Sequence, residues 1–475
     1  MVYQRHDYEF YSSKLPAKQE SQGADAYRYE GDARKFTTEN TITYKRKIGG
    51  HTVDGLLGFS AATKNENYIS VNASGLLSDD LKWNNLNGVT SKENYTCRSS
   101  SSKVVNESIF ARVNYNYKSR YYLTGTVRWD GSSNFAANRK WGFFPSGAFK
   151  WSIKNEPWMK SVRAVNDLSL RISAGLTGND AIPAYRSLQA YSTSTGEWVF
   201  NGSRGADVYP SRVANPNLTW ETTKLYNVAL DASFFKDRLG VSLEVYKSTT
   251  TNLLLSVQTI NTTGYPSRLT NLGQTSNKGV ELTLDGKIIE KKKFGWTSEL
   301  TISYNSQMVD NIGNEDYVAT VMSPGNTSFM MYGYKKGYPL NALWGFEYAG
   351  VWHSVEEFER NNYTKEYISN NTVTSASENL GWPKYVDQNN DGALTMDDLI
   401  YLGSSDPVLY GGFQNTFHWG GLKLGIFFSY SLGGKIYNYS ELIMAGSYAT
   451  NQYRYMLNAW HPLRNPDSNL PRAGT

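Results

Sequence analysis

The stretch LSLRISAGL, from Leu168 to Leu176, alternates between apolar residues and polar or small ones. The apolar set is Leu168, Leu170, Ile172, Ala174 and Leu176, and the set between them is Ser169, Arg171, Ser173 and Gly175. Because successive side chains of a β-strand point to opposite faces, this period of two predicts a strand with one apolar face and one polar face. Nearly the same alternation returns along the whole chain, which therefore reads as a series of two-faced strands.

We count about 12 such strands from the alternation. They span residues 36–47, 51–63, 106–118, 121–130, 142–154, 167–176, 220–235, 238–249, 278–288, 294–305, 409–419 and 422–432. The first 35 residues are polar and irregular, and no strand is expected there.

The links between these strands alternate between short and long. The short links lie at 48–50, 119–120, 236–237, 289–293 and 420–421, with a somewhat longer one at 155–165. The long links span 64–105, 131–141, 177–219, 250–277 and 307–408. In an up-and-down antiparallel sheet every second link lies at the same end, so one end of this sheet should carry the short links and the other end the long ones. Outer-membrane β-barrels have this asymmetry, with short periplasmic turns and long extracellular loops.

Aromatic residues gather near the short links. The sequence holds 35 Tyr and 13 Trp. The residues close to short turns are Tyr115, Tyr117, Tyr121, Tyr122, Phe234, Phe235, Phe294, Trp296 and Trp419. This placement is typical of an aromatic girdle at a membrane interface. The alternative is that aromatic residues simply favour strands.

Bulk composition narrows the classes of protein. The net charge of +5 over 475 residues is small and the basic residues are scattered, which argues against a nucleic-acid partner. Cys97 is the single cysteine, so no internal disulfide and no cysteine-based metal site are expected. The opening MVYQRHDYEF has no apolar core of a signal peptide, so a barrel containing this chain is expected to be part of something longer.

Alternation alone leaves two folds open. A soluble sandwich also alternates, with its polar face toward water. The long matched strands and one-sided loops favour an antiparallel transmembrane β-barrel with a polar lumen, which would carry charges such as Arg112, Arg128, Arg171, Asp231 and Glu244. In that fold Leu168 lies toward the periplasm and Leu176 toward the exterior, with the apolar side chains of this strand on lipid.

The link 307–408 is interpreted as one large outward loop. Gly345 to His353 looks extended but would break the up-down parity as a barrel strand, so it is placed inside this loop. Ser354 followed by Glu357 is a capping-box spacing, which predicts a short helix there.

Residues 387–398 fit the calcium-loop template D-x-[DN]-x-[DN]-G with an acidic residue at the twelfth place. The predicted ligands are Asp387, Asn389, Asp391, the carbonyl of Ala393, Thr395 and Asp398. Alternating oxygens can wrap one hard cation, and Gly392 permits the sharp turn. Asp398 stands where Glu is usual, and its shorter side chain coordinates less fully. We expect a structural Ca²⁺; the alternative is an Asn/Asp-rich hairpin without metal.

Other chemistry is sparse. The five histidines are scattered, no nucleophile elbow or phosphate loop is present, and no catalytic residue is assigned. Five loop aromatics, which are Trp198, Tyr332, Tyr334, Trp344 and Trp382, could stack on sugars. Packing of the loops on each other is the favoured interpretation.

The run RWDGSSNFAANRKWGFFPSGAFKWSI, residues 128–153, resembles the signature of the SusC/RagA family of TonB-linked outer-membrane proteins. LSLRISAGLTGN and TNLGQTSNKGVEL resemble later blocks of that family, and the calcium-like loop with the strand after residue 408 is similar to its large outer loop and return strand.

The resemblance implies a fold and a function. The family barrel has roughly 22 strands around an N-terminal plug, so this chain would be a partial barrel, with the plug domain absent. The family implies an outer-membrane importer of oligosaccharides, or of other large nutrients such as peptides, typical of Bacteroidetes. It would work with a SusD-like lipoprotein and with TonB, and it is not an enzyme. The alternative is a soluble extracellular β-rich carbohydrate-binding protein or glycoside hydrolase with a structural calcium.

Overall fold

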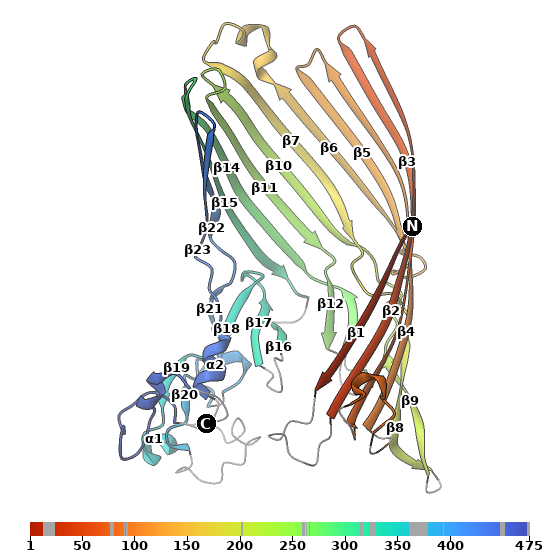
Figure 1. Cartoon of the computed structure of the whole chain (residues 1–475), viewed down its shortest axis with the longest axis vertical. Helices are drawn as coiled ribbons and strands as arrows, with labels where there is room; N and C mark the ends of the chain where they lie inside the picture. Colours follow the sequence, from red (N-terminus) through yellow and green to blue (C-terminus); the bar gives the residue numbers. More distant parts are fainter. Residues whose placement is uncertain are drawn as a thin grey trace. The chain divides into compact units, whose positions relative to one another are not determined.

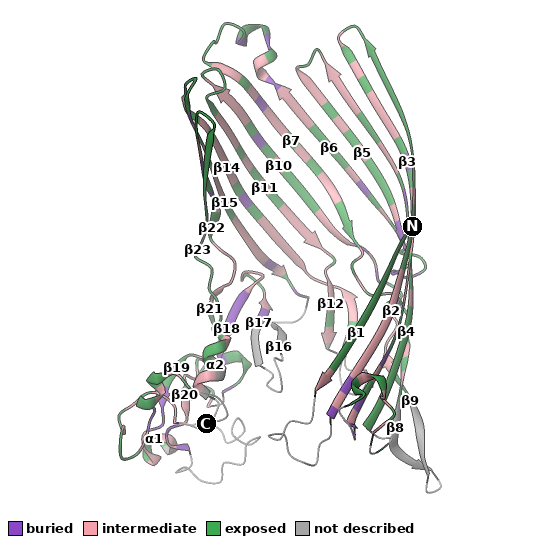
Figure 2. Ribbon diagram, in the orientation of Figure 1, coloured by how far each residue is buried: buried purple, intermediate pink, exposed green. Residues whose placement is uncertain are grey.

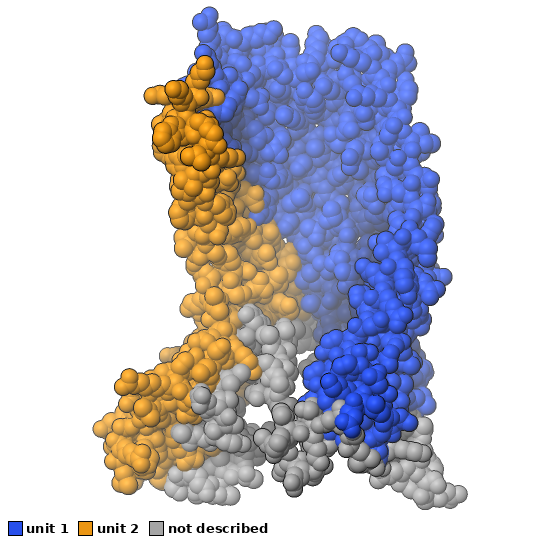
Figure 3. All heavy atoms as spheres, viewed as in Figure 1, with its two compact units in different colours: residues 1–274, 283–288 blue, residues 275–282, 289–475 orange. Residues whose placement is uncertain are grey.

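The computed structural model describes residues 1–12, 24–76, 80–89, 91, 94–200, 203–258, 262, 264–265, 267–313, 317–322, 329–360, 379–392, 394–446 and 452–472. The chain forms two compact units (Figure 3). Unit 1 holds Met1–Gln274 and Thr283–Ile288, and unit 2 holds Thr275–Leu282 and Ile289–Thr475. Among the described residues, no helix has the length and apolar character needed to cross a membrane.

Unit 1 is built around an antiparallel sheet (Figure 1). Its strands are β1 (Val2–Ser12), β2 (Ala24–Ile48), β3 (His51–Leu76), β4 (Tyr95–Tyr117), β5 (Tyr121–Ser132), β6 (Trp141–Ser152), β7 (Val165–Asn179), β10 (Glu221–Phe234) and β11 (Leu239–Thr251). Each strand pairs with the next in this order. The up-and-down order expected from the sequence is therefore confirmed.

Two expectations for the start of the chain are wrong. Residues 2–12 form β1, and β2 begins at Ala24, where no strand was expected. Most of the link 64–105 is also strand, because Lys64 pairs with Val104 and the ladder continues to Ala73 and Tyr95. These segments are rich in charged and hydroxyl residues on both faces, so they lack the apolar alternation by which the other strands were found.

Short turns close the sheet at one end, called here the short-turn end. Lys118 and Ser119 both have positive φ, of 49° and 55°, as a tight two-residue hairpin turn requires. Between β6 and β7 the longer link contains two 3-10 turns, η3 (Ile153–Asn155) and η4 (Pro157–Met159). The short links expected from the sequence all lie between successive strands as predicted.

The opposite end, called the long-loop end, carries additional structure. It includes η1 (Lys82–Asn84) and two hairpins, β8 (Ala190–Phe200) with β9 (Ser203–Arg212) and β12 (Leu254–Gln258) with β13 (Ser267–Asn271). Phe135, Phe144, Leu218 and Trp220 form a buried cluster that joins the loops after β5 and before β10 to the sheet. Long links thus fold on one another at this end.

The two faces of the unit 1 sheet differ in chemistry. Phe59, Ile109, Trp129 and Phe143 are register partners on four successive strands, and all four side chains are exposed. We call the side that bears them the apolar face. The other side, the polar face, carries the register partners Asp54, Asn114, Thr124, Ala148, Ser173 and Asn227. Exposed and intermediate residues alternate along many of these strands (Figure 2).

Strand β7 shows the alternation with one exception. Ile172 is 43% exposed on the apolar face, and Arg171 lies on the polar face opposite Ala229. Leu176 was expected on lipid, but it packs against the buried cluster of Phe144 and Trp220. The strand reaches the folded loops at this point, so its last apolar side chain finds protein partners.

Unit 2 contains β15 (Phe294–Asn311), β22 (Leu409–Trp419) and β23 (Leu422–Leu432), which pair antiparallel in that order. Residues of β14 (Gln274–Glu290) belong to both units. Further elements are β16 (Tyr317–Met322), β17 (Phe329–Lys335), β18 (Ala342–Gly345), β19 (Tyr348–Val351), β20 (Pro383–Tyr385), β21 (Ile400–Ser404), α1 (Val355–Arg360), η7 (Met396–Asp398), α2 (Tyr439–Gly446) and η8 (Arg454–Asn458).

The expectations for the segment after Gly345 are confirmed. β19 lies there and pairs with β20 in a small separate sheet, while β16, β17, β18 and β21 form another. α1 begins after Ser354, whose Oγ accepts a hydrogen bond from the backbone N of Glu357 at 3.1 Å.

Candidate functional site

The polar face of unit 1 carries an ion network. Arg171 Nε lies 2.6 Å from Asp231 Oδ2, and Arg171 Nη2 lies 3.6 Å from Glu244 Oε2. Ser242 Oγ donates a hydrogen bond of 2.8 Å to Asp231 Oδ1. These charges come from three adjacent strands, and Arg171 pairs with both carboxylates, which lowers the cost of placing them on a wall whose other side is apolar. Sequence reasoning had placed Arg171, Asp231 and Glu244 on this face, and the structure brings them together.

A hollow of about 550 Å³ lies over the same unit, lined among others by Arg112, Thr126, Arg128, Asp130 and Ser146. Arg128 is held by Asp130, two residues along β5, with Nη2 2.9 Å from Oδ1. The Arg128 guanidinium also lies 5.0 Å from the centre of the Phe110 ring. The hollow therefore combines hydroxyl groups and oriented cations with apolar residues such as Phe144 and Leu225, which suits a molecule with both polar and apolar groups.

Strands β1 to β4 run on past the last β4–β5 pair, Asn106 with Ser132, and form what we call the extension. It consists of β1 and residues 24–35, 64–76 and 95–105, at the lower right of Figure 1. The β2–β3 register is unbroken from Asp25 to Ile48, so each side of the extension continues one face of the sheet. Odd-numbered residues of β2, such as Lys45 opposite Asp54, stay on the polar face throughout.

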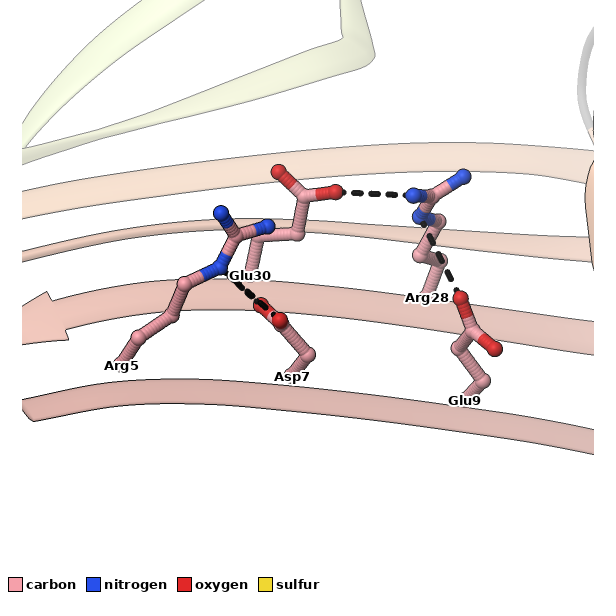
Figure 4. Close-up of polar contacts among 5 residues, drawn as sticks. All are labelled: Arg5, Asp7, Glu9, Arg28 and Glu30. Atoms are coloured by element: carbon pink, nitrogen blue, oxygen red, sulfur yellow. Dashed lines mark hydrogen bonds and ion pairs between the residues drawn. The ribbon is translucent and has the colours of Figure 1, made fainter.

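The continuation of the apolar face changes to charged residues in the extension (Figure 4). Arg28 Nη2 lies 2.9 Å from Glu30 Oε1, and Arg28 Nε lies 3.8 Å from Glu9 Oε1. Arg5 Nε lies 2.8 Å from Asp7 Oδ2. Exposed pairs of this kind add little stability. Their position indicates where an apolar environment ends and water begins, since unpaired charges are costly in hydrocarbon.

The continuation of the polar face is aromatic instead. Tyr29 and Tyr68 are stacked, with ring centres 5.5 Å apart and 26° between their planes. Tyr8 and Tyr27 are tilted, with ring centres 5.9 Å apart. Sequence reasoning missed this cluster because it took residues 1–35 as irregular. The alternation of Tyr27 and Tyr29 with Arg28 and Glu30 is the signal that could have revealed it.

The calcium-like loop is tightly folded through its own backbone. Asp387 accepts hydrogen bonds from the N–H groups of Asn390 at 2.7 Å and Gly392 at 2.9 Å. Asp398 is fully buried and accepts from the N–H groups of Gln388 at 2.8 Å and Thr395 at 2.7 Å. Thr395 and Asp398 also form a capping box at the start of η7.

These contacts bear on whether an ion fits. A carboxylate oxygen that accepts one N–H retains another lone pair, so the donors are compatible with a hard cation. Within the described ranges, no three His, Cys, Asp or Glu side chains are grouped as a metal site. Coordination would therefore also need Asn389, Thr395 and the carbonyl of Ala393, which lies outside the described residues. Calcium stays a prediction.

Two of the loop aromatics take part in packing. Trp344 is buried, donates from Nε1 to the Gly333 carbonyl at 3.0 Å, and contacts Tyr338. Arg472 lies over Trp382 at 5.8 Å. For Trp344 the favoured packing interpretation is confirmed. The side chains of Trp198 and Tyr332 lie outside the described part of the structure.

A large antiparallel sheet with one exposed apolar face, one polar face and loops at one end defines the class of transmembrane β-barrel proteins. The family model "TonB dependent receptor-like, beta-barrel" matches residues 2–386. The chain therefore belongs to the TonB-dependent receptor β-barrel family, whose members are outer-membrane receptors and transporters and not enzymes. The resemblance seen in the sequence is confirmed.

Two curated relatives illustrate this membership. TonB-dependent receptor P26 of Formosa agariphila is 32% identical over 464 residues, which cover 95% of this chain and 44% of the relative. TonB-dependent receptor SusC of Bacteroides thetaiotaomicron is 30% identical over 315 residues, which cover 64% of this chain and 29% of the relative. The chain spans less than half the length of these curated relatives.

One solved structure shows the same fold. The RagAB peptide transporter superposes with a TM-score of 0.74 at 24% identity, and the match covers 100% of this chain and 49% of that chain. This structural similarity agrees with the antiparallel β-barrel wall expected from the sequence.

Proposed function

We propose that this chain is the wall of an importer that brings oligosaccharides, or other large nutrients such as peptides, across the outer membrane. The observation that carries the proposal is the separation of chemistry between the two faces of one sheet. Ile109 and Trp129 are exposed on the apolar face, while Arg171 and Asp231 pair on the polar face. Such a wall separates lipid from a polar passage.

The volume of the hollow over the polar face supports a cargo larger than an ion. A hollow of about 550 Å³ over the polar face is larger than an ion requires. RagAB is named a peptide transporter, which supports a peptide as the second candidate cargo. Family membership supports dependence on TonB, and a SusD-like lipoprotein is the proposed extracellular partner.

We propose further that residues 387–398 bind a structural Ca²⁺. Asp387, Asn389, Asp391, Thr395, Asp398 and the Ala393 carbonyl would supply the oxygens. The support is the template match together with the turn through Gly392, whose φ is +83°.

An uptake experiment tests the proposed function. A strain that lacks the receptor and its complemented parent would be given fluorescent oligosaccharides and peptides of defined length. We expect uptake of at least one cargo to be lost in the deletion strain and restored by the receptor. Co-purification in detergent would show whether a lipoprotein accompanies it. Equal uptake of every cargo by both strains would refute the importer.

A further inference from the structure

The aromatic cluster of the extension is unusually well arranged for binding. Tyr29 and Gly31 lie two residues apart on the same side of β2, and Tyr68 is the register partner of Gly31. A Cβ on Gly31 would lie 2.7 Å from Tyr29 Oη and 3.0 Å from two ring carbons of Tyr29. The Tyr29 ring therefore packs over the backbone of Gly31, beside Tyr68. Gly31 has no Cβ, and this leaves room for the ring.

The surrounding rings enlarge this surface. Tyr8 is the register partner of Tyr29, and Phe10 is the partner of Tyr27. Tyr8 is 57% exposed, Phe10 49% and Tyr68 38%. Five aromatic residues from three strands thus form one accessible surface, which we call the aromatic platform: Tyr8, Phe10, Tyr27, Tyr29 and Tyr68.

Charge is divided unequally between the two sides of the same strands. Arg28 and Glu30 alternate with Tyr27, Tyr29 and Gly31, so the charged ladder lies on the opposite side of the sheet. Next to the platform stand hydroxyl and amide residues, with register partners Ser70 for Tyr29 and Asn72 for Tyr27, while Arg98, the partner of Ser70, adds a cation on this side. The nearby Lys64 and Glu66 neutralise each other, with 2.6 Å between Nζ and Oε1.

A surface of this composition matches one kind of ligand. The C–H groups on the face of a pyranose ring carry partial positive charge and complement the negative face of an aromatic ring. Hydroxyl and amide groups at the edge, together with the Arg98 guanidinium, can bond the sugar hydroxyls, and charges of both signs on this side, including the paired Lys64 and Glu66, leave no dominant field for an acidic ligand.

We propose that the aromatic platform is a binding site for neutral oligosaccharides, which stack on Tyr29 and Tyr68. The inference rests on the proposed function, since it names the cargo class and the place of its capture. The platform continues the polar face at the long-loop end, so sugar held there would stand at the entrance to the polar passage.

Calorimetry on the detergent-solubilised protein tests the platform. The probes are cellohexaose, maltohexaose, xylohexaose, an acidic hexagalacturonide and an uncharged hexapeptide. We expect at least one neutral hexasaccharide to bind. Tyr29→Leu and Tyr68→Leu should each weaken its Kd about tenfold, as loss of one stacked ring does in other aromatic platforms.

Two variants separate the platform from general damage. Gly31→Ala keeps both rings but forces Tyr29 to swing away, and it should weaken binding by a similar factor. Tyr3→Leu removes a tyrosine of β1 on the charged side of the extension and should change the Kd less than about twofold. Heat-modifiable gel mobility checks that each variant folds.

Several outcomes overturn the proposal. Binding of the hexapeptide or hexagalacturonide alone, or of no probe, would refute a neutral-sugar site. Unchanged affinity in Tyr29→Leu and Gly31→Ala would refute the platform. In the uptake assay, import at the wild-type rate in these variants would refute the platform as a cargo site but would agree with the proposed importer. Absence of import in the parent strain would refute the proposed function itself.

Discussion

At the residue scale, a group of polar contacts around Glu156 stabilises the short-turn end of the sheet. Glu156 precedes η4 at the short-turn end and is buried. Its carboxylate accepts hydrogen bonds from the Tyr121 hydroxyl at 2.6 Å and from Trp151 Nε1 at 3.1 Å, and Arg120 Nη1 lies 3.3 Å away. These groups tie the longest link of this end to the strands. The sequence offered no sign of this contact, because the partners are up to 36 residues apart.

The pH dependence of this contact has a definite sign. The hydrogen bond from Tyr121, opposed by desolvation and aided by Trp151 and Arg120, holds the pKa of Glu156 below its usual range. The stabilisation is therefore complete above the usual glutamate pKa and is lost as pH falls through the lower folded value. We expect the Tm of the native protein in detergent to fall as the pH is lowered through this range. Glu156→Gln should lower the Tm at neutral pH and make the Tm depend less on pH in the acid range. The same dependence of Tm on pH in the variant and the native protein would contradict a stabilising role of the Glu156 carboxylate.

The calcium loop provides a second prediction for single residues. Asp391→Asn should weaken Ca²⁺ affinity about tenfold or more, because it removes a ligand charge. Asp397→Asn is the matched control, since Asp397 is exposed and outside the proposed ligand set. Calorimetry with Ca²⁺ measures both. Equal affinity of the two variants, or no binding by the native protein, would favour the metal-free hairpin.

At the element scale, each strand is specified by the chemistry of its two faces. The ranges 409–419 and 422–432 expected from the sequence coincide with β22 and β23. Alternation indicates the two strands, and the Gly420-Gly421 turn marks where β22 ends and β23 begins. β1 and the start of β2 were missed because charge occupies one side of the extension and tyrosine the other. A search for aliphatic alternation passes over the alternation of tyrosine with charged residues in 27–30, because tyrosine is only partly apolar.

Substitutions on the two faces of β7 should differ sharply. Ile172→Lys places a charge on the apolar face and should cost about 2–4 kcal/mol if the residue lies near the bilayer midplane. Ser173→Lys lies on the polar face and should cost much less. Urea titration of the protein folded into lipid vesicles measures the difference. Equal destabilisation by the two lysines would contradict the assignment of the faces.

The turn between β22 and β23 gives a matched pair of glycines. Gly420 has φ of +58°, and a Cβ on either Gly420 or Gly421 would meet no atom within 4 Å. Gly420→Ala should therefore destabilise by about 1 kcal/mol through backbone strain alone. Gly421→Ala, which does not have a positive φ, should be near neutral. The same urea titration applies, and a larger loss in Gly421→Ala would refute this account of the turn.

At the scale of the whole molecule, the sheet has an apolar face and a polar face, and the proposed importer would carry its cargo along the polar one. The proposed import needs energy from outside the wall, and we propose that TonB supplies it. We expect a protonophore to stop uptake of the cargo while leaving its surface binding in place. Fluorescence of washed cells before and after treatment measures the two steps. Uptake that continues at the untreated rate would contradict energised import.

The sequence by itself determined the class of the protein. A period of two in side-chain polarity fixes which residues share a face, and the alternation of short and long links fixes the two ends, because both depend on neighbours along the chain. The tertiary structure decided the rest: the extension, the packing of Leu176 against Phe144 and Trp220, and the gathering of Tyr8, Tyr29 and Tyr68. These depend on the register between strands distant in sequence, which aligns side chains that no local pattern connects.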